Sequence, residues 1–243
     1  MRFDVAFAWR AFLAALEGIP VSLFLTFGSL LVAFPIGFAA ALICFKKVRV
    51  LDKIVSVIVS FLRGTPIVVQ IFIVYSGLPR VLNEIGELLH LSIDFYKMNL
   101  YVYGIWVFSM SLGAVLCEVF RSALSAVDKT QMEAAKSISL TSFQAYRLII
   151  LPQALVSAVP NICMATLNTF KATSLVYIMA IHDITGAART IAGESYQYIE
   201  AYTVIFFVYI VLCFLMQKAA VLLENWLKRY KQPILKTSAK AGA

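Results

Sequence analysis

Long runs without charged residues are the feature that most limits what this chain can fold into. Five such runs are bounded by charge, and each approaches or exceeds the ~20 residues that an α-helix needs to cross a bilayer. They are 19–45, 54–79 (interrupted only by Arg63), 98–117, 148–170 and 201–217. Composition agrees, since 61% of the 243 residues are hydrophobic and 14% are charged, unlike a soluble domain. The sequence predicts an all-α polytopic membrane protein with about five transmembrane helices.

The distribution of lysine and arginine predicts how these helices are oriented. Basic residues gather in alternate connecting segments, which are 46–53, 121–147 and the chain from 218 onward. The segments between them hold fewer basic residues and more acidic ones. Cytoplasmic loops carry the excess of lysine and arginine. We therefore expect the N-terminus outside and the C-terminus in the cytoplasm.

The chain divides into three predicted parts. Residues 1–18 form an N-terminal segment that is apolar nearly all round, interrupted by Arg10 and Glu17, and is expected to lie at the outer interface. Residues 19–228 form the transmembrane domain. Residues 229–243 form a cytoplasmic tail.

Several other classes of protein are disfavoured. The net charge of +8 is spread over loops beside the spans, which favours contact with membrane lipid over binding of nucleic acid. The histidines are isolated, and the cysteines lie in or at the ends of apolar runs without metal-type spacing. We therefore predict no metal and no cofactor. These residues are Cys44, Cys117, Cys163, Cys213, His90 and His182.

The stretch 121–152 is longer than a simple connection and is patterned. Asp128 or Thr130 can cap a helix, and Glu133 follows Thr130 at the spacing of a capping box. Met132, Ala135 and Ile138 then form a narrow apolar stripe. This predicts a short helix beneath the membrane whose alanines allow close approach to a partner protein. The alternative is a helix that rests on the bilayer surface.

The same stretch resembles the EAA loop of permease subunits of ATP-binding cassette (ABC) importers. The matching residues are Glu133, Ala134, Ala135, Gln144, Leu151, Pro152, Gln153 and Ala154. Ser139 departs from the pattern, because the family usually has glycine there and serine disfavours a positive φ. The resemblance implies that Glu133, Ala134, Ala135, Ser139 and Pro152 couple the permease to an ATPase, so that 121–152 is a coupling loop.

Three further stretches resemble the polar amino-acid branch of this family. They are 63–66 with Gln70, 118–121, and Asn161 with the block 171–175, in which Ala172 stands where the branch usually has aspartate. The resemblance runs from about Gly18 to Glu224.

The resemblance also implies partners and a location. It implies a second permease, identical or paralogous, two cytoplasmic ABC ATPases, an extracytoplasmic solute-binding protein, and a place in the bacterial inner membrane. The chain has no GxxxxGK[ST] phosphate-binding loop. We therefore expect a non-enzymatic subunit whose partners hydrolyse ATP.

Polar residues within the spans suggest the solute pathway. Lys171 lies in an otherwise uncharged run and could bind a solute carboxylate, although a snorkelling or structurally paired lysine is the alternative. The other predicted pathway residues are Asn161, Thr173, Ser174, Thr65 and Gln70. A polar amino acid such as cystine is the expected solute, and a cationic one is disfavoured.

Three charged residues near the cytoplasmic ends of the spans have two interpretations. Glu118 can form a structural ion pair with Arg63 or Arg121, or the three residues can form a gate below the solute. A secondary transporter or channel would also explain buried charges, but it gives no reason for the patterned loop. A membrane-embedded enzyme would need a cluster of catalytic groups within the spans.

Overall fold

The computed structural model describes residues 3–90 and 93–229, and all regular structure in these residues is helical. The elements are α1 (Val5–Phe45), α2 (Leu51–Gly64), α3 (Ile67–Leu88), η1 (Phe95–Lys97), α4 (Leu100–Ser125), α5 (Lys129–Ser137), α6 (Ser142–Ala145), the π-helical turn η2 (Tyr146–Ile150), α7 (Leu151–Ala172), η3 (Thr173–Met179), α8 (Ile184–Ser195) and α9 (Tyr198–Arg229). The all-α prediction is confirmed. Of the predicted tail 229–243, residues 230–243 lie outside the described residues.

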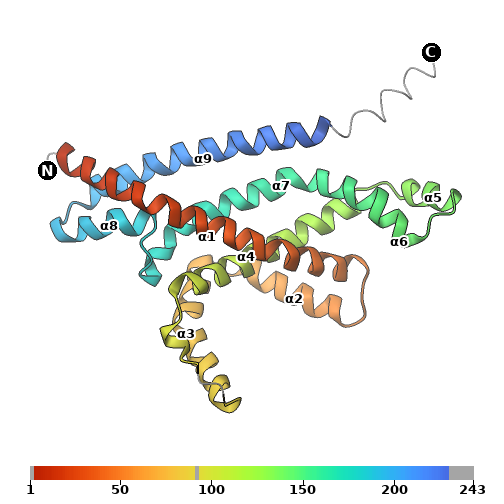
Figure 1. Ribbon diagram of the computed structural model, residues 1–243, viewed down its shortest axis with the longest axis horizontal. Helices are drawn as coiled ribbons and strands as arrows, with labels where there is room; N and C mark the ends of the chain where they lie inside the picture. The colour runs from red at the N-terminus through yellow and green to blue at the C-terminus, as the bar shows by residue number, and fades with distance from the viewer. Residues whose placement is uncertain (1–2, 91–92, 230–243) are drawn as a thin grey trace.

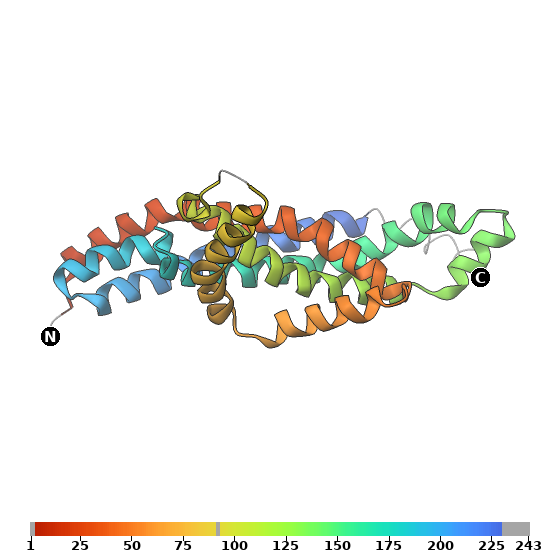
Figure 2. The ribbon, with the colours of Figure 1, turned by 90° about the horizontal axis from the view of Figure 1, so that it is seen from below.

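Five helical stretches are long and apolar enough to cross a membrane, which confirms the predicted number of spans. They are Val5–Phe45, Ile67–Leu88, Leu100–Ser125, Ser142–Met179 and Tyr198–Leu227. Figures 1 and 2 show α1, α4, α7 and α9 running along the long axis of the molecule. The hairpin of α5 and α6 lies at one end, α8 and the N-terminus lie at the other, and α3 projects to the side.

The first helix is longer than the sequence indicates. Asp4 caps it by accepting a hydrogen bond from the Phe7 N–H (3.0 Å), and the helix continues without a break to Phe45. The segment 1–18, expected to be a separate interfacial element, is therefore continuous with the first span from Val5 onward. At 1.5 Å per residue the 41 residues extend about 60 Å, roughly twice the hydrocarbon thickness. Part of α1 must therefore lie outside the hydrocarbon.

The second predicted span, 54–79, is divided between two helices, and the second of them continues beyond it to Leu88. Thr65 is extended, with ψ 137°, because Pro66 follows it. Proline disfavours a helical conformation in the residue before it and has no N–H to donate. The break separates α2 from α3, and only α3 is among the stretches long enough to cross a bilayer. Gln70 closes the break by donating from Nε2 to the carbonyl oxygens of Leu62 (2.8 Å) and Thr65 (3.1 Å).

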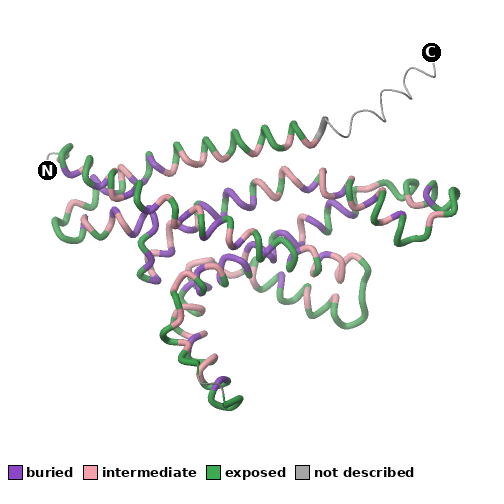
Figure 3. Tube along the Cα trace, viewed as in Figure 1, coloured by how far each residue is buried: buried purple, intermediate pink, exposed green. Residues whose placement is uncertain are grey.

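Small residues allow α1 to pack closely against its neighbours. A Cβ atom added at Gly18 would lie 2.3 Å from the carbonyl carbon of Asp183, and one at Gly37 would lie 2.8 Å from the Gly113 oxygen. In bilayers, where helices gain little from hydrophobic burial against each other, such close approach is a main source of packing energy. In Figure 3, burial is concentrated where α1, α4, α7 and α8 meet, whereas the outer sides of α9, α2 and α3 are largely exposed.

Replacing Gly18 by alanine tests this close packing. The added methyl group would meet the backbone of Asp183 and Ile184 rather than a movable side chain, so α1 and the start of α8 must separate. We expect the apparent melting temperature of the purified protein to fall by several degrees, as for an overpacking change of about 1–3 kcal/mol. Thermal unfolding followed by tryptophan fluorescence measures this.

Gly77→Ala is the matched control, because a Cβ atom at Gly77 would meet nothing within 4 Å and alanine favours a helix. Equal melting temperatures for the two variants would contradict the close contact at Gly18.

Candidate functional site: a coupling hairpin and a polar groove

The hairpin of α5 and α6 is built from local capping interactions. Asp128 rather than Thr130 caps α5, since its Oδ1 accepts the Thr130 N–H (2.9 Å). This hydrogen bond lowers the pKa of the Asp128 carboxyl below its usual value. At the other end of α5, the N–H groups of Ser139 and Leu140 donate to the carbonyl oxygens of Lys136 (3.0 Å) and Ala135 (3.1 Å). This pattern is a Schellman motif.

Ser139 occupies the left-handed position of that motif, with φ 64°. A residue other than glycine pays about 1–2 kcal/mol for this conformation. The turn thus keeps a geometry that suits glycine, although the chain has serine there. Next, Thr141 and Gln144 form a capping box that begins α6, and the π-helical turn η2 leads into α7, where Pro152 is exposed near the helix start.

The hairpin divides the predicted coupling residues into two groups. Glu133, Ala134 and Ser139 are exposed, but Ala135 is only 1% exposed and lies inside the hairpin. In this conformation Ala135 therefore presents almost no surface to a partner protein. Its small side chain lets α5 approach α6 and η2.

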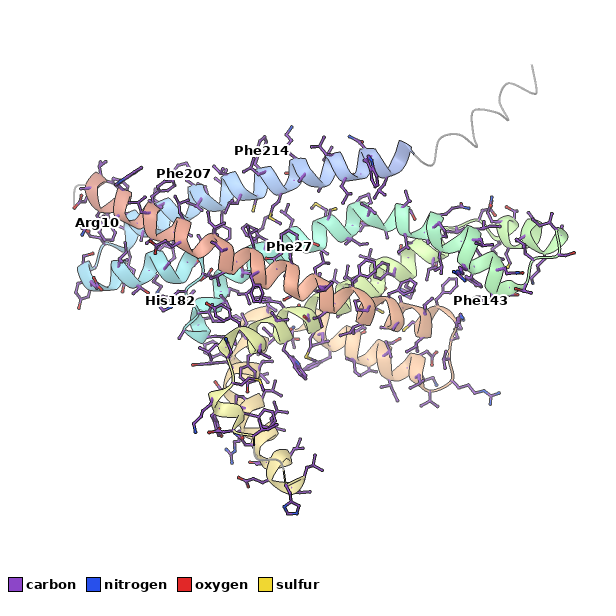
Figure 4. All side chains as sticks on the ribbon, in the orientation of Figure 1. Arg10, Phe27, Phe143, His182, Phe207 and Phe214 are labelled. Atoms are coloured by element: carbon purple, nitrogen blue, oxygen red, sulfur yellow. The ribbon has the colours of Figure 1, made fainter. Side chains whose placement is uncertain are left out.

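Two exposed apolar residues at the hairpin tip were not among the predicted coupling residues. Ile138 is 70% exposed and Phe143 is 73% exposed, and Figure 4 shows Phe143 at the end of the molecule opposite Arg10. Ile138 lies outside the five candidate spans, and Phe143 lies at the start of the fourth. Large apolar side chains exposed at such positions are typical of a protein-binding surface. The sequence signal was present, because both side chains are apolar in a loop otherwise rich in polar residues.

A groove of about 690 Å³ lies between α7 with η3, α8 and α9. Lys171 and Ser174, both predicted for the solute pathway, line it. The other lining residues are Leu167, Leu175, Tyr177, Thr185, Tyr202, Ile205, Phe206, Tyr209, Ile210, Cys213, Phe214 and Gln217. Lys171 is the charged residue among them, and none is acidic. The groove therefore combines one cation with hydroxyl and aromatic groups.

The remaining predicted pathway residues lie elsewhere. Thr173 is fully buried and its hydroxyl donates to the Phe170 carbonyl oxygen (2.7 Å), as threonine commonly does within a helix. Thr65 and Gln70 hold the break between α2 and α3, since Gln70 Nε2 also donates to Thr65 Oγ1 (3.1 Å). None of these three residues lines the groove.

Asn161 belongs to a different feature of α7. It is one of five exposed residues that follow each other at alternating spacings of four and three, which places them on one face of the helix. These residues are Ser157, Asn161, Met164, Asn168 and Lys171. We call this face the polar strip. Amide, hydroxyl and ammonium groups are costly in hydrocarbon, so the strip is expected to face protein or water.

Among the charged residues expected to pair or to form a gate, Glu118 pairs with Arg121. The Arg121 Nε lies 3.0 Å from Glu118 Oε2 on the same helix, α4. Arg63 is exposed near the end of α2 and forms no ion pair within residues 3–90 and 93–229. Of the two structural pairs that the sequence allows, the structure has the one with Arg121.

A buried carboxyl group, absent from the sequence prediction, lies beside the groove. Asp183 follows the exposed His182 at the turn that leads into α8 (Figure 4), and it is 0% exposed. Its Oδ1 accepts the Gly186 N–H (2.8 Å) and caps α8, and its Oδ2 accepts the Tyr209 hydroxyl (3.4 Å). Burial raises the pKa of Asp183 to about 6, although these hydrogen bonds oppose the shift.

Comparison with known proteins identifies the class to which this chain belongs. Residues 33–229 match the family described as the binding-protein-dependent transport system inner membrane component. The chain belongs to this family. It is an ABC importer permease of the polar amino-acid branch, an integral, multi-pass inner-membrane component. Such permeases are transport components rather than enzymes, and they work with ATPase and binding-protein partners.

Individual relatives agree with this assignment. The L-cystine transport system permease protein TcyL of Bacillus subtilis is 37% identical over 191 residues, covering 79% of this chain and 77% of TcyL. The octopine transport system permease protein OccM of Rhizobium radiobacter is 31% identical over 224 residues, covering 92% of this chain and 90% of OccM.

Solved structures share the fold. The crystal structure of an amino acid ABC transporter with histidines has a TM-score of 0.79 at 25% identity, and the match covers 93% of this chain and 99% of that chain. An inward-facing MetNI methionine ABC transporter has a TM-score of 0.67 at 17% identity, covering 92% and 99%. The latter is similar in fold alone.

The raised pKa of Asp183 makes stability depend on pH. Because the pKa of about 6 in the folded protein lies above the ordinary aspartate value of 3.8, ionisation of Asp183 destabilises the fold. The protonated carboxyl makes its full contribution to the free energy of unfolding below pH 3.8. This contribution, about 3 kcal/mol, is lost as pH rises through 6. We expect Asp183→Asn, which keeps an oxygen to cap α8, to raise the apparent melting temperature at pH 7.5.

Melting curves between pH 4 and 7.5 measure this effect. The difference between variant and wild type should be about halved at pH 5 and reduced to about a fifth at pH 4. A variant that melts below wild type at pH 7.5 would show that the ionised carboxylate stabilises the fold instead.

Proposed function

We propose that this chain forms the path by which an ATP-driven importer moves a polar, zwitterionic amino acid, with L-cystine as the first candidate. The observation that supports this most directly is Lys171, the charged side chain lining an otherwise uncharged groove between α7, α8 and α9. A buried or membrane-embedded cation is costly unless it has a partner or a function. A solute carboxylate would supply that partner.

The shape and chemistry of the groove suit a small polar solute. Its volume of about 690 Å³ falls within the roughly 300–1,000 Å³ typical of ligand sites. Aromatic walls from Tyr177, Tyr202 and Phe206 can cover the apolar part of an amino acid, and Ser174 adds a hydroxyl. The absence of acidic lining residues disfavours a solute with a cationic side chain. The similarity to TcyL, whose name specifies L-cystine, makes cystine the first solute to test.

We assign the hairpin of α5 and α6 to ATPase coupling. Ile138 and Phe143 supply an apolar tip, and Glu133 and Ala134 lie exposed on α5. In this proposal the tip enters a groove on one ATPase, and the corresponding tip of the second permease enters a groove on the other ATPase. ATP binding then changes the relative stability of the inward-open and outward-open states of the permease. For this to happen, the contacts between hairpin and ATPase must differ between the two states. Ser139 and Pro152 keep the hairpin in place beside α7.

The same proposal orients the chain and adds a second permease copy. The hairpin lies on the same side of the molecule as the end of α1 and the start of α2 (Figure 1), and Lys46 lies over the ring of Tyr146 in η2. The connection between α1 and α2 also contains Lys47 and Arg49. By the positive-inside rule this end is cytoplasmic, which puts the N-terminus outside. The polar strip on α7 is exposed in the single chain, so a second permease, identical or paralogous, is proposed to face it. An extracytoplasmic binding protein would deliver the solute.

Replacing Lys171 by methionine tests the solute site. Methionine keeps most of the length and apolar contacts but removes the charge. We expect binding of labelled L-cystine by the assembled transporter to weaken about tenfold or more, as for the loss of a charge-assisted hydrogen bond. Equilibrium binding to the complex in lipid nanodiscs measures this.

Lys218→Met is the matched control, because Lys218 also lies on a spanning helix, above the Phe214 ring, and does not line the groove. Equal binding of L-cystine by wild type and Lys171→Met would show that Lys171 does not bind the solute.

Replacing Ile138 and Phe143 by serine tests the coupling hairpin. We expect the double variant to fold and insert normally, because both side chains are exposed, but to lose most of the ATPase subunit during purification. The measurement is the ratio of ATPase to permease that elutes together from a size-exclusion column. Tyr196→Ser is the control, since Tyr196 is 85% exposed and lies just after α8, at the opposite end of the molecule (Figure 1). Retention of the ATPase by the double variant would refute docking through this tip.

A further inference from the structure

A second pocket lies where η3 turns into α8. Its volume is about 460 Å³, and its lining comes from η3, the turn and α8. Arg189 is the charged lining residue, His182 also lines it, and no lining residue is acidic. Figure 4 shows His182 toward the end of the molecule opposite Phe143. In the proposed orientation this end is extracytoplasmic, so we call the cavity the outer pocket.

Arg189 is held in the outer pocket without using its hydrogen-bond donors. Its guanidinium carbon lies 4.3 Å from the centroid of the Tyr177 ring, which is a cation–π contact. The side chain is partly buried, yet it forms no hydrogen bond or ion pair within residues 3–90 and 93–229. A guanidinium group carries five N–H donors. Arg189 therefore offers donors that are free to bind another molecule.

These free donors match a carboxylate. The planar fork of a guanidinium binds the two oxygens of a carboxylate at once, which a lysine ammonium does not do. Contact with the Tyr177 ring orders the Arg189 side chain before a ligand arrives, so less conformational freedom is lost on binding. The volume of the outer pocket also falls within the roughly 300–1,000 Å³ typical of ligand sites. The outer pocket thus suits a small carboxylate.

Tyr177 connects the outer pocket to the groove, because it lines both cavities. Each cavity contains one permanently charged cation, Arg189 in the outer pocket and Lys171 in the groove, and neither has an acidic lining residue. A carboxylate on the surface of the binding protein could also bind Arg189. The shared wall favours the solute instead, since a solute that moves past Tyr177 meets a second cation for the same carboxylate.

We propose that the outer pocket is the first binding site of the solute on this chain. Arg189 binds the solute carboxylate there, before the solute passes Tyr177 and reaches Lys171. This inference rests on the proposed function and adds a second carboxylate site to it.

The test uses two thiol reagents that differ in a carboxylate. Thr190 also lines the outer pocket, and its hydroxyl donates to the Gly186 carbonyl oxygen of its own helix (2.8 Å). Thr190→Cys therefore places a thiol beside Arg189 with little disturbance. Iodoacetate and iodoacetamide alkylate a thiol in the same way: the sulfur bonds to the methylene carbon, iodide leaves, and the thiol proton goes to the buffer. Only iodoacetate carries a carboxylate.

The measured quantity is the rate with iodoacetate divided by the rate with iodoacetamide, called the carboxylate ratio. It is followed at position 190 by peptide mass spectrometry, on the complete transporter in nanodiscs. The salt concentration is about 0.15 M, at which charges more than ~8 Å apart are largely screened. A change in the reactivity of the thiol itself affects both reagents and cancels in the ratio.

Adding Arg189→Gln to Thr190→Cys should lower the carboxylate ratio about tenfold or more, the loss expected for charge-assisted hydrogen bonds. Arg10→Gln is the matched control. Arg10 also contacts an aromatic ring, that of Phe7 (5.5 Å), but it does not line the outer pocket. It should leave the ratio unchanged.

Protection by a bound molecule shows where the carboxylate comes from. Diaminosuberate is cystine with methylene groups in place of its sulfurs, so it cannot exchange with a thiol. At saturating concentration and without the binding protein, we expect it to slow alkylation of Thr190→Cys by iodoacetamide severalfold. The same addition should have no effect once Arg189→Gln is present. If wild type binds another amino acid better than L-cystine, that amino acid is used.

Three results would overturn the inference. The first is an equal carboxylate ratio with and without Arg189→Gln. The second is protection by the binding protein alone and none by the solute, which would make the outer pocket a docking site for that protein. If Arg189→Gln fails to assemble, absence of protection by the solute in Thr190→Cys is sufficient. Failure of the wild-type complex to bind any labelled amino acid would instead refute the proposed function, and with it the solute as the occupant.

Discussion

The backbone of a membrane-spanning chain must satisfy its own hydrogen bonds, because hydrocarbon supplies no partner for a peptide group. In this chain the five candidate spans are helices, and where a helix breaks, a side chain replaces the lost partner. Gln70 does so at the break after Gly64, by donating to the free carbonyl oxygens of Leu62 and Thr65. Asp183 does so at the start of α8. The two breaks give α3 its sideways direction and bring α8 against the groove.

The packing of α1 follows from the same constraint. Helices in a bilayer gain little by hiding apolar surface from lipid, so they gain contact by approaching closely. Gly18 and Gly37 allow this approach on α1, and Ser22 contributes a hydroxyl that accepts the Ile184 N–H (3.4 Å). The first turn of α8 is thereby held between α1 and α9. One wall of the groove, which includes Thr185, depends on that contact.

The sequence predicted the helical class, the number of spans and a short helix in the patterned loop, because hydropathy and capping are local properties. It predicted Lys171 and Ser174 together, and both line the groove. It could not predict that Thr173, the residue between them and one step from Ser174, turns its hydroxyl into the helix, or that Ala135 faces α6. Asp183 was missed because it lies in a short polar connection, and its burial results from α1 and α9, which are distant in sequence.

The central claim is that ATP, through the hairpin of α5 and α6, drives solute through this permease. The most direct measurement is uptake of labelled L-cystine into liposomes containing the permease and its ATPase, with the binding protein outside. We predict accumulation against a gradient only when ATP is enclosed with the ATPase, and none with a hydrolysis-deficient ATPase. Accumulation driven by a proton or sodium gradient in liposomes without the ATPase would contradict the account and indicate a secondary transporter.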